Sequence, residues 1–415
     1  MVTQFNTLKS YIFPIILLLS ILLGGLTGYV FNQNVAWLKP FGDIFLNLIF
    51  TTIVPLIFFS VSSAIARTGS IGKLGKIFYS MTIIFLFTGI VAAVYALFVV
   101  LLFPPAQNMP VLLESSKQLS PTNLPDRLIE IFTVPEFSKL FSHEHILALV
   151  LFSILVGLAV AHSKDKGTIF NSFLKAGEDV FMSVFRLIMY YAPIGFFAYF
   201  AVIVSEIGPQ LMENYLRIAI LYYTASVFYF FFALTAYAYL AGKSQGVRLF
   251  WRNIFLPAAT SIATCSSAAS IPANLMATKS MRIPAEIYET SIPLGSIIHK
   301  DGSVMGGVFK IAFLFGIFHL PFSSLPVLMM ALGVSLLVGT VMGAIPSGGM
   351  LGELLILSVY GFPPSVLIAI AAISIIIDPI ATMVNVTSNS VCSMMIARLV
   401  EGKNWFLRSY NENNL

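Results

Sequence analysis

Long apolar runs joined by short polar links fill the first part of the chain, up to about residue 250. A helix needs about 20 consecutive apolar residues to cross a bilayer, and most of these runs reach that length. The pattern therefore predicts six transmembrane helices, with a polar segment from Pro104 to about His143 between the third and the fourth. The predicted spans are about Tyr11–Val30, Phe41–Ala64, Phe78–Phe103, Ile146–Ala161, Val180–Val204 and Ile218–Leu240.

The pattern changes after residue 250, where runs of small residues interrupt two apolar stretches. Phe255–Met276 contains TCSSAAS at 264–270, and Leu325–Val359 contains GAIPSGG at 343–349. Each interruption leaves two arms too short to span, so each stretch predicts a re-entrant hairpin that returns to the side from which it enters. Apolar helices at about Ile287–Phe318 and Val366–Met395 follow the hairpins. Hairpin and helix, repeated once, predict an inverted repeat whose hairpins enter from opposite faces.

The predicted fold is therefore an all-α polytopic membrane protein with eight transmembrane helices and two re-entrant helical hairpins. The composition agrees, because hydrophobic residues make up 58% of the 415 residues and charged residues only 10%. A soluble domain carries about 25% charged residues. The sixth span is rich in Tyr and Phe, which suits a lipid-facing or interfacial surface.

Positive charges gather in the links after the second, fourth and sixth spans. By the positive-inside rule, both termini of this multi-pass protein are predicted to lie in the cytoplasm. The predicted location is a plasma membrane, such as the inner membrane of a bacterium. The net charge of +5 lies at the ends of spans, so it does not indicate nucleic-acid binding. Cys265 and Cys392 both have apolar surroundings, so no disulfide framework is predicted.

The sequence His299-Lys300-Asp301 interrupts the apolar stretch Pro293–Lys310. A charge at the bilayer centre costs about 3 kcal/mol on insertion scales, so such residues usually line a protected binding or transport site. Glycines follow and weaken the helix, and many secondary transporters build their sites at broken helices. If the helix unwinds here, Lys300 and Asp301 can meet. The alternative is a structural ion pair that only neutralises itself.

A second polar stripe lies in the last apolar helix. Thr382 and Asn385 follow Asp378 at i+4 and i+7, so the three share one helical face, and Asn389 is one turn further on. Pro379 removes the helical hydrogen bond to residue 375. A carboxylate, a hydroxyl and an amide in one stripe suit a zwitterion, with its ammonium at the carboxylate and its carboxylate at the amide. The alternative is polar contact between helices.

The two hairpin tips complete the candidate substrate site. Small residues let the backbone approach a ligand, and the free N–H groups at the start of a helix can hold an anion. The Gly-rich second tip can open and close over a site. Either tip can also be an ordinary turn. The candidate residues at the tips are Cys265, Ser266, Ser267, Ala344, Pro346 and Gly348.

Two other classes of function compete with a transporter. An intramembrane aspartyl protease needs two aspartates, and Asp301 and Asp378 both lie in apolar segments. The residues that precede them do not fit the pattern of that class, and re-entrant tips have no place in it. A passive channel is the other possibility. Lys310 and Glu353 also lie within apolar runs. Lys310 can extend to water or pair, and Glu353 can face the cytosol or a cavity.

Four segments together resemble the dicarboxylate/amino acid:cation symporter family. They are TCSSAASIP, PLGSIIHKDGS, the Pro-containing second tip and D-x-x-x-T-M-V-N-V-T. That family includes glutamate/aspartate transporter homologues and neutral amino acid exchangers. The resemblance implies a homotrimeric symporter with a transport domain that moves like an elevator against a trimerisation scaffold. It implies no enzymatic activity and no cofactor. The implied partners are membrane lipid and a small amino acid substrate, transported with Na⁺ or H⁺.

The resemblance also divides the chain. Spans one and two (1–77) belong to the scaffold, and span three (78–103) to the transport domain. The outer loop and spans four to six fill 104–250, with spans four and five in the scaffold and span six in the transport domain. The transport core (251–415) consists of hairpin one, span seven, hairpin two and span eight.

Substrate roles carry over residue by residue. Asp378 matches the family aspartate that holds the substrate ammonium, Asn385 the asparagine for the α-carboxylate, and Ser267 a serine of the first tip. Members with acidic substrates have an arginine at the position of Ala381 or, alternatively, of Cys265. Without either guanidinium, a side-chain carboxylate lacks a bidentate partner. Neutral amino acids are therefore favoured; the alternative is a sodium-coupled symporter of dicarboxylates or acidic amino acids.

The cation sites depart further from the family. Where the family has the motif N-M-D-G-T, this chain has HKDGS at 299–303. Asn389 stands where the family has an aspartate that binds sodium. The Tyr and Thr-Ser ligands of the third span align with Phe85, Thr88 and Gly89. Hard cations prefer oxygen ligands, and only the aspartate of the HKDGS segment clearly remains as an anionic one. The sequence therefore leaves open whether sodium binds.

We expect Lys300 to hold electrostatically the place that sodium has in relatives, unless it binds a side-chain carboxylate of the substrate. Transport would then be sodium-independent, or coupled to protons through His299 or Lys300. A degenerate member that binds substrate without moving it is the remaining alternative. The candidate residues for the coupling ion or its surrogate are Thr88, Gly295, His299, Lys300, Asp301, Asn385 and Asn389.

Overall fold

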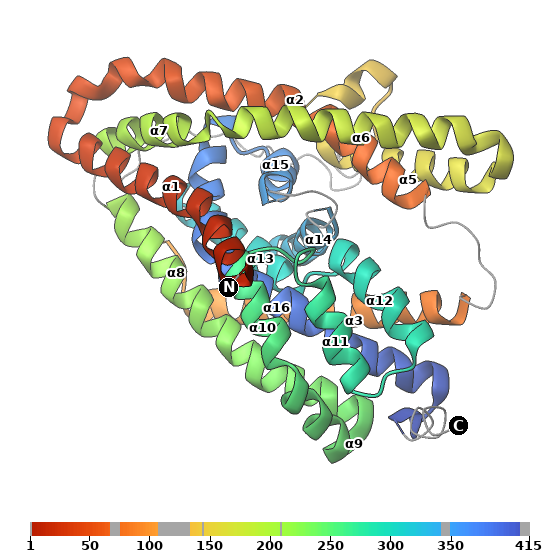
Figure 1. Ribbon diagram of the computed structural model, residues 1–415. Helices are drawn as coiled ribbons and strands as arrows, with labels where there is room; N and C mark the ends of the chain where they lie inside the picture. The colour runs from red at the N-terminus through yellow and green to blue at the C-terminus, as the bar shows by residue number, and fades with distance from the viewer. Residues whose placement is uncertain are drawn as a thin grey trace.

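The computed structural model describes residues 2–66, 75–106, 133–142, 145–207, 210–341 and 349–406. Within these ranges the chain forms helices and no strand. The predicted all-α class is therefore confirmed for the described part of the chain. Figure 1 shows the arrangement.

The helices of the first part follow the predicted spans closely. The fifth span is the exception, because it consists of two helices that meet at a bend of 54°. Pro193, the second residue of the second helix, accounts for the break, since proline supplies no N–H and disfavours helix at the residue before it. The helices are α1 (Val2–Phe31), α2 (Lys39–Ala66), α3 (Gly75–Leu102), α5 (Ile146–His162), α6 (Thr168–Met189), α7 (Ala192–Ile207), α8 (Gln210–Phe228) and α9 (Leu234–Asn253).

The last third has the two predicted helix pairs and the predicted break in the seventh span. The tip of the second pair, with Ala344, Pro346 and Gly348, lies outside the described residues. The re-entrant course of both pairs stays a prediction. The helices are α10 (Phe255–Thr264), α11 (Ile271–Ser280), α12 (Ala285–Ile298), α13 (Asp301–Ile317), α14 (Leu325–Val341), α15 (Gly349–Tyr360) and α16 (Leu367–Glu401).

Length and apolar composition qualify four helical segments of the described chain as membrane spans, or five if the bent pair α6–α7 is one span. The four are Asn34–Ser63, Gly75–Leu102, Leu211–Asn253 and Pro364–Glu401. The protein is therefore a multi-pass membrane protein. The count of eight spans stays a prediction, because α5 and the two halves of the broken seventh span, α12 and α13, each have 17 residues or fewer.

The helices pack in two groups. In the first group α1 packs on α7, and α2 packs on α5, α6 and α7. In the second group α16 contacts α3, α8, α9, α10, α12 and α13, while α13 also contacts α3 and α14. Contacts between the groups are few, and they include α1 with α10 and α16, and α5 with α15. In Figure 1 α2, α5, α6 and α7 lie above the second group, and α1 runs down from them towards α10 and α16. The candidate site described below lies within the second group.

Glycines permit close helix crossings within each group. A Cβ added to Gly28 in α1 would lie 2.2 Å from the carbonyl oxygen of Ala201 in α7. A Cβ added to Gly302 in α13 would lie 2.3 Å from the carbonyl oxygen of Ala381 in α16. Small residues let helix backbones approach this closely within membranes. Gly302 therefore fixes how near the broken helix lies to α16.

A buried ion pair ties α13, α15 and α16 together. Lys310 Nζ lies 3.2 Å from Glu353 Oε1 and donates a hydrogen bond of 2.8 Å to Ser374 Oγ. Ser374 in turn donates to Glu353. Lys310 and Glu353 are almost entirely buried, so their charges compensate each other away from water. Of the alternatives for Lys310, pairing is the one observed, whereas Glu353 faces neither the cytosol nor a cavity but Lys310.

We expect Gly302→Ala to lower the melting temperature of the purified protein, because the new methyl group meets backbone rather than a movable side chain. Overpacking of this kind costs about 1–3 kcal/mol. Gly333→Ala in α14 is the matched control, since nothing lies within 4 Å of a Cβ there. That control should keep or raise the melting temperature. Equal melting temperatures for Gly302→Ala and the wild type would contradict the close crossing.

We expect Lys310→Met to destabilise the protein by about 3–5 kcal/mol, because it leaves the Glu353 carboxylate buried without its cation. The double variant Lys310→Met/Glu353→Met removes both charges and should recover most of the loss. Thermal unfolding of the three proteins measures both effects. A double variant no more stable than Lys310→Met would show that the two residues do not act as a pair.

Candidate functional site

The break between α12 and α13 places two neighbouring side chains in different environments. His299 and Lys300 both have extended backbone angles, with φ of −130° and −147°. Successive side chains of extended backbone point to opposite sides. His299 is buried against α3 and α16, whereas Lys300 is only partly buried. Helix α13 then restarts at Asp301, whose side chain is fully buried.

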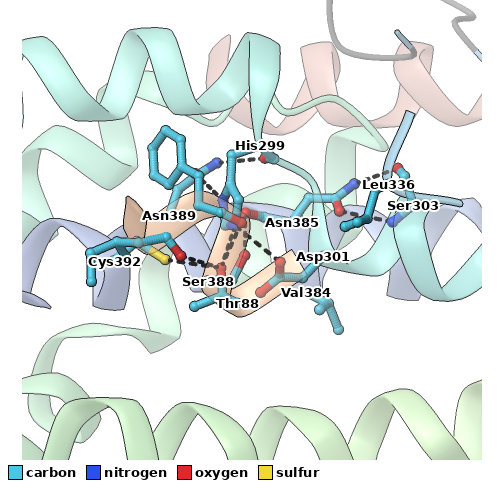
Figure 2. A network of polar contacts seen from close by, with 12 residues as sticks. Thr88, His299, Asp301, Ser303, Leu336, Val384, Asn385, Ser388, Asn389 and Cys392 are labelled. Atoms are coloured by element: carbon cyan, nitrogen blue, oxygen red, sulfur yellow. Dashed lines mark hydrogen bonds and ion pairs between the residues drawn. The ribbon is translucent and has the colours of Figure 1, made fainter. Parts of the chain in front are cut away.

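Asp301 is the centre of a network that joins four helices (Figure 2). His299 Nε2 lies 3.0 Å from Asp301 Oδ1. The same ring nitrogen is 2.7 Å from Thr88 Oγ1 of α3, and ring nitrogen Nδ1 is 2.8 Å from Asn389 Oδ1 of α16. Tyr229 donates its hydroxyl hydrogen to Asp301 Oδ2 at 3.1 Å. The helix break thus gathers a carboxylate, an imidazole and three neutral polar groups in the protein interior.

Apolar and small residues close this network. The ring of Phe85 stacks on the His299 ring with 4.3 Å between centroids. A Cβ at Gly295 would meet Asn389 Oδ1 at 2.5 Å, so only glycine leaves room for that amide. Of the predicted coupling-ion residues, Thr88, Gly295, His299, Asp301 and Asn389 are therefore brought together.

Asn385 is hydrogen-bonded to the start of α13. Its Oδ1 accepts a hydrogen bond from the backbone N–H of Ser303 at 3.1 Å, and its Nδ2 donates to Ser303 Oγ at 3.1 Å. The side chain is buried. Asn385 therefore satisfies one of the free N–H groups at the start of α13. It links the stripe on α16 to the restarted helix.

Asp378 and Thr382 form a second polar group on α16. Thr382 donates its hydroxyl hydrogen to Asp378 Oδ1 at 3.1 Å, as the i+4 spacing predicts. Asp378 is exposed, although the residues around it in this helix are mostly buried. Lys300 is near enough to Asp378 for the two charges to interact, although no ion pair joins them, and Cys265 also lies near this carboxylate. An accessible carboxylate thus lies near a lysine and near the first hairpin tip.

The first tip is a tight turn built from small residues. Cys265 has the left-handed backbone conformation, with φ of +47°. Ser266 Oγ accepts a hydrogen bond from the backbone N–H of Ala269 at 3.2 Å, and Ser267 is buried. Ala381, one turn from Asp378, is buried as well. Of the predicted substrate residues that the structure describes, Cys265 lies near Asp378, and Asn385 is hydrogen-bonded to Ser303.

Lys300 does not make the contact that the unwound helix was expected to permit. The partner of Asp301 is His299, and Lys300 interacts with Asp378 instead. The extended backbone explains the difference, because it turns the two neighbours apart. Residue spacing alone could not show which of them faces Asp301.

Tyrosines of the sixth span were missed as site residues. Tyr229 reaches Asp301, Tyr222 donates to the carbonyl oxygen of Gly302 at 2.6 Å, and both are buried. The expectation of a lipid-facing or interfacial surface is therefore wrong for these tyrosines, whereas Phe231 and Phe232 are exposed. The spacing of seven residues between the two tyrosines places them on one helical face. That spacing was the available signal.

Known proteins resemble this chain over most of its length. The sequence profile of the sodium:dicarboxylate symporter family matches residues 13–399. A proton/sodium-glutamate symport protein of Geobacillus stearothermophilus is 27% identical over 399 residues, 92% of each chain. A C4-dicarboxylate transport protein of Anaeromyxobacter sp. (strain K) is 27% identical over 298 residues, which cover 69% of this chain and 66% of that relative.

A proton/sodium-glutamate symport protein of Bacillus subtilis (strain 168) is 24% identical over 391 residues, covering 91% of this chain and 90% of the relative. The family profile spans nearly all the helices described above, including both polar groups. The chain therefore belongs to the sodium:dicarboxylate symporter family.

Proposed function

We propose that this protein is a secondary transporter that carries an amino acid across the bacterial inner membrane, with both termini in the cytoplasm. Membership of the family makes it a transporter rather than an enzyme. The observation that carries the substrate proposal is the exposed carboxylate of Asp378 in an otherwise buried helix, with Lys300 close enough to interact. A charge is costly within a membrane, so an accessible one indicates a site that a ligand can reach.

A zwitterion fits the charges around Asp378. The substrate ammonium would bind Asp378, which Thr382 orients through its hydrogen bond. The substrate carboxylate would bind Lys300 and the polar groups of the first tip, including Ser266 and Ser267. Such charge-assisted contacts are stronger than neutral hydrogen bonds.

A neutral side chain on that amino acid is favoured by the residues nearest Asp378. Ala381 and Cys265 supply no positive charge for a second carboxylate. The second candidate is an acidic amino acid or a dicarboxylate, with Lys300 as the partner of the extra carboxylate. The names of the relatives favour this candidate, since they specify glutamate and C4-dicarboxylates.

The two packing groups support an elevator-type movement. The first group contains α1, α2, α5, α6 and α7, and it would be the scaffold of a homotrimer. The second group contains α3 and the helices from α8 onward, and it would carry the site across the membrane. The few contacts between the groups would permit sliding. This division corresponds to scaffold segments within 1–77 and 104–250 and to transport segments at 78–103, in span six and at 251–415.

The direct test is uptake of labelled amino acids into liposomes that contain the purified protein. We expect saturable, stereospecific uptake that unlabelled neutral amino acids inhibit more strongly than glutamate or succinate do. Asp378→Asn should abolish this uptake, because the ammonium loses its anionic partner. Asp179→Asn on the exposed face of α6 is the matched control and should transport normally.

The same variants separate the two candidates. A dicarboxylate without an ammonium group would be repelled by Asp378, so Asp378→Asn would keep or improve its uptake. Stronger inhibition by glutamate than by neutral amino acids would favour the acidic substrate. Uptake that does not saturate would indicate a channel and contradict the proposal.

A further inference from the structure

The Asp301 carboxylate needs a positive partner within the protein. It is fully buried, in a helix that is itself buried along almost its whole length. An ionised carboxylate removed from water is strongly unfavourable unless a cation and hydrogen bonds compensate it. The family description names sodium, so a bound cation is the partner that the family implies. The residues around Asp301 decide whether such an ion fits.

The surroundings of the His299 ring fix where its hydrogens lie. Asn389 Nδ2 points to the carbonyl oxygen of His299 at 3.4 Å, so the amide oxygen is the atom that faces ring nitrogen Nδ1. That oxygen can only accept, and therefore Nδ1 carries a hydrogen. The other amide orientation would bring two oxygens together at the backbone carbonyl.

Ring nitrogen Nε2 also faces acceptors. Thr88 Oγ1 lies within donating distance of the backbone carbonyl oxygen of Ile84, at 3.1 Å, which leaves its lone pairs for Nε2. The second neighbour of Nε2 is Asp301 Oδ1 at 3.0 Å. A bare Nε2 would place its lone pair against the carboxylate oxygen at 3.0 Å, whereas a hydrogen on Nε2 can be donated to Thr88 Oγ1 and puts positive charge beside Asp301. With hydrogens on both nitrogens, the ring is an imidazolium.

The donor set does not fit a sodium ion in addition to this ring. The oxygens of Thr88 and Asn389 that could bind a cation are already directed at the ring nitrogens. The face of the ring is covered by Phe85, which offers no oxygen. Asp301 Oδ1 accepts no hydrogen bond, but the ring lies against it at 3.0 Å, and a second positive charge there would be repelled.

We propose that the imidazolium of His299 is a tethered cation that takes the place of a bound sodium ion at Asp301. The helix break presents it, Thr88 and Asn389 orient it, and Asp301 neutralises it. Residue 300, which the sequence suggested for this role, lies on the other side of the extended segment. Only one consequence of this inference rests on the proposed transport function, namely that any coupling of transport to sodium must use another part of the protein.

Sodium binding by the purified protein tests the inference without any transport assay. The measured quantity is the rise in melting temperature when choline chloride is replaced by an equal concentration of sodium chloride. We expect His299→Asn to show a larger sodium-dependent rise than the wild type, by several degrees, because the opened pocket keeps its carboxylate and its oxygens. The double variant His299→Asn/Asp301→Asn should lose that gain.

Two single variants complete the comparison. His162→Asn, at the exposed end of α5, should behave as the wild type in both salts. Asp301→Asn should leave any sodium response of the wild type unchanged. If Asp301→Asn removes a sodium response that the wild type has, or if folded His299→Asn gains none, the inference is overturned.

The protonation state of the wild-type ring gives a test that does not require a variant at His299 to fold. The chain has five histidines. Replacing the other four with glutamine and labelling histidine with ¹⁵N leaves His299 as the only signal. Hydrogens on both ring nitrogens at neutral pH are expected. A neutral ring with one unprotonated nitrogen would overturn the inference, whatever the uptake assays show.

Discussion

The rest of this site depends on one constraint, which is that a carboxylate without access to water must be compensated within the protein. This carboxylate lies at the start of a helix inside a membrane protein. Asp301 must be compensated, and the chain compensates it from α3, α12, the sixth span and α16 together. Each of these elements is thereby tied to the restarted helix. The small residues Gly295 and Gly302 are needed because the helices must approach closely for such short side chains to meet.

The two polar groups have separate tasks because extended backbone separates neighbouring side chains. His299 lies against Asp301, whereas Lys300 is near enough to the accessible Asp378 for the two charges to interact. One group is closed by an aromatic ring and has its charged and polar side chains directed at one another within the protein, which suits a permanent structural charge. The other keeps an exposed carboxylate, which suits a ligand that comes and goes. The Lys310–Glu353 pair adds a second buried charge contact, which holds the second helix pair to the same core.

Much of this could be read from the sequence, and the remainder has physical reasons. Apolar length predicted the helices, and the run His299-Lys300-Asp301 followed by glycines predicted the break in the seventh span. The i+4 spacing predicted the contact between Asp378 and Thr382. Spacing could not predict that Asn385 caps α13, because that contact depends on how two helices cross. The seven-residue spacing of Tyr222 and Tyr229 indicated one shared helical face, but not that this face points inward, because tyrosine equally suits a membrane surface.

The central claim is that an imidazolium, and not a sodium ion, neutralises Asp301. A high-resolution cryo-electron microscopy map of the full-length protein in excess sodium chloride tests this most directly. The account predicts the His299 ring against Asp301, with no ion density within coordinating distance of that carboxylate. Ion density beside Asp301, with the ring of His299 turned away, would contradict it.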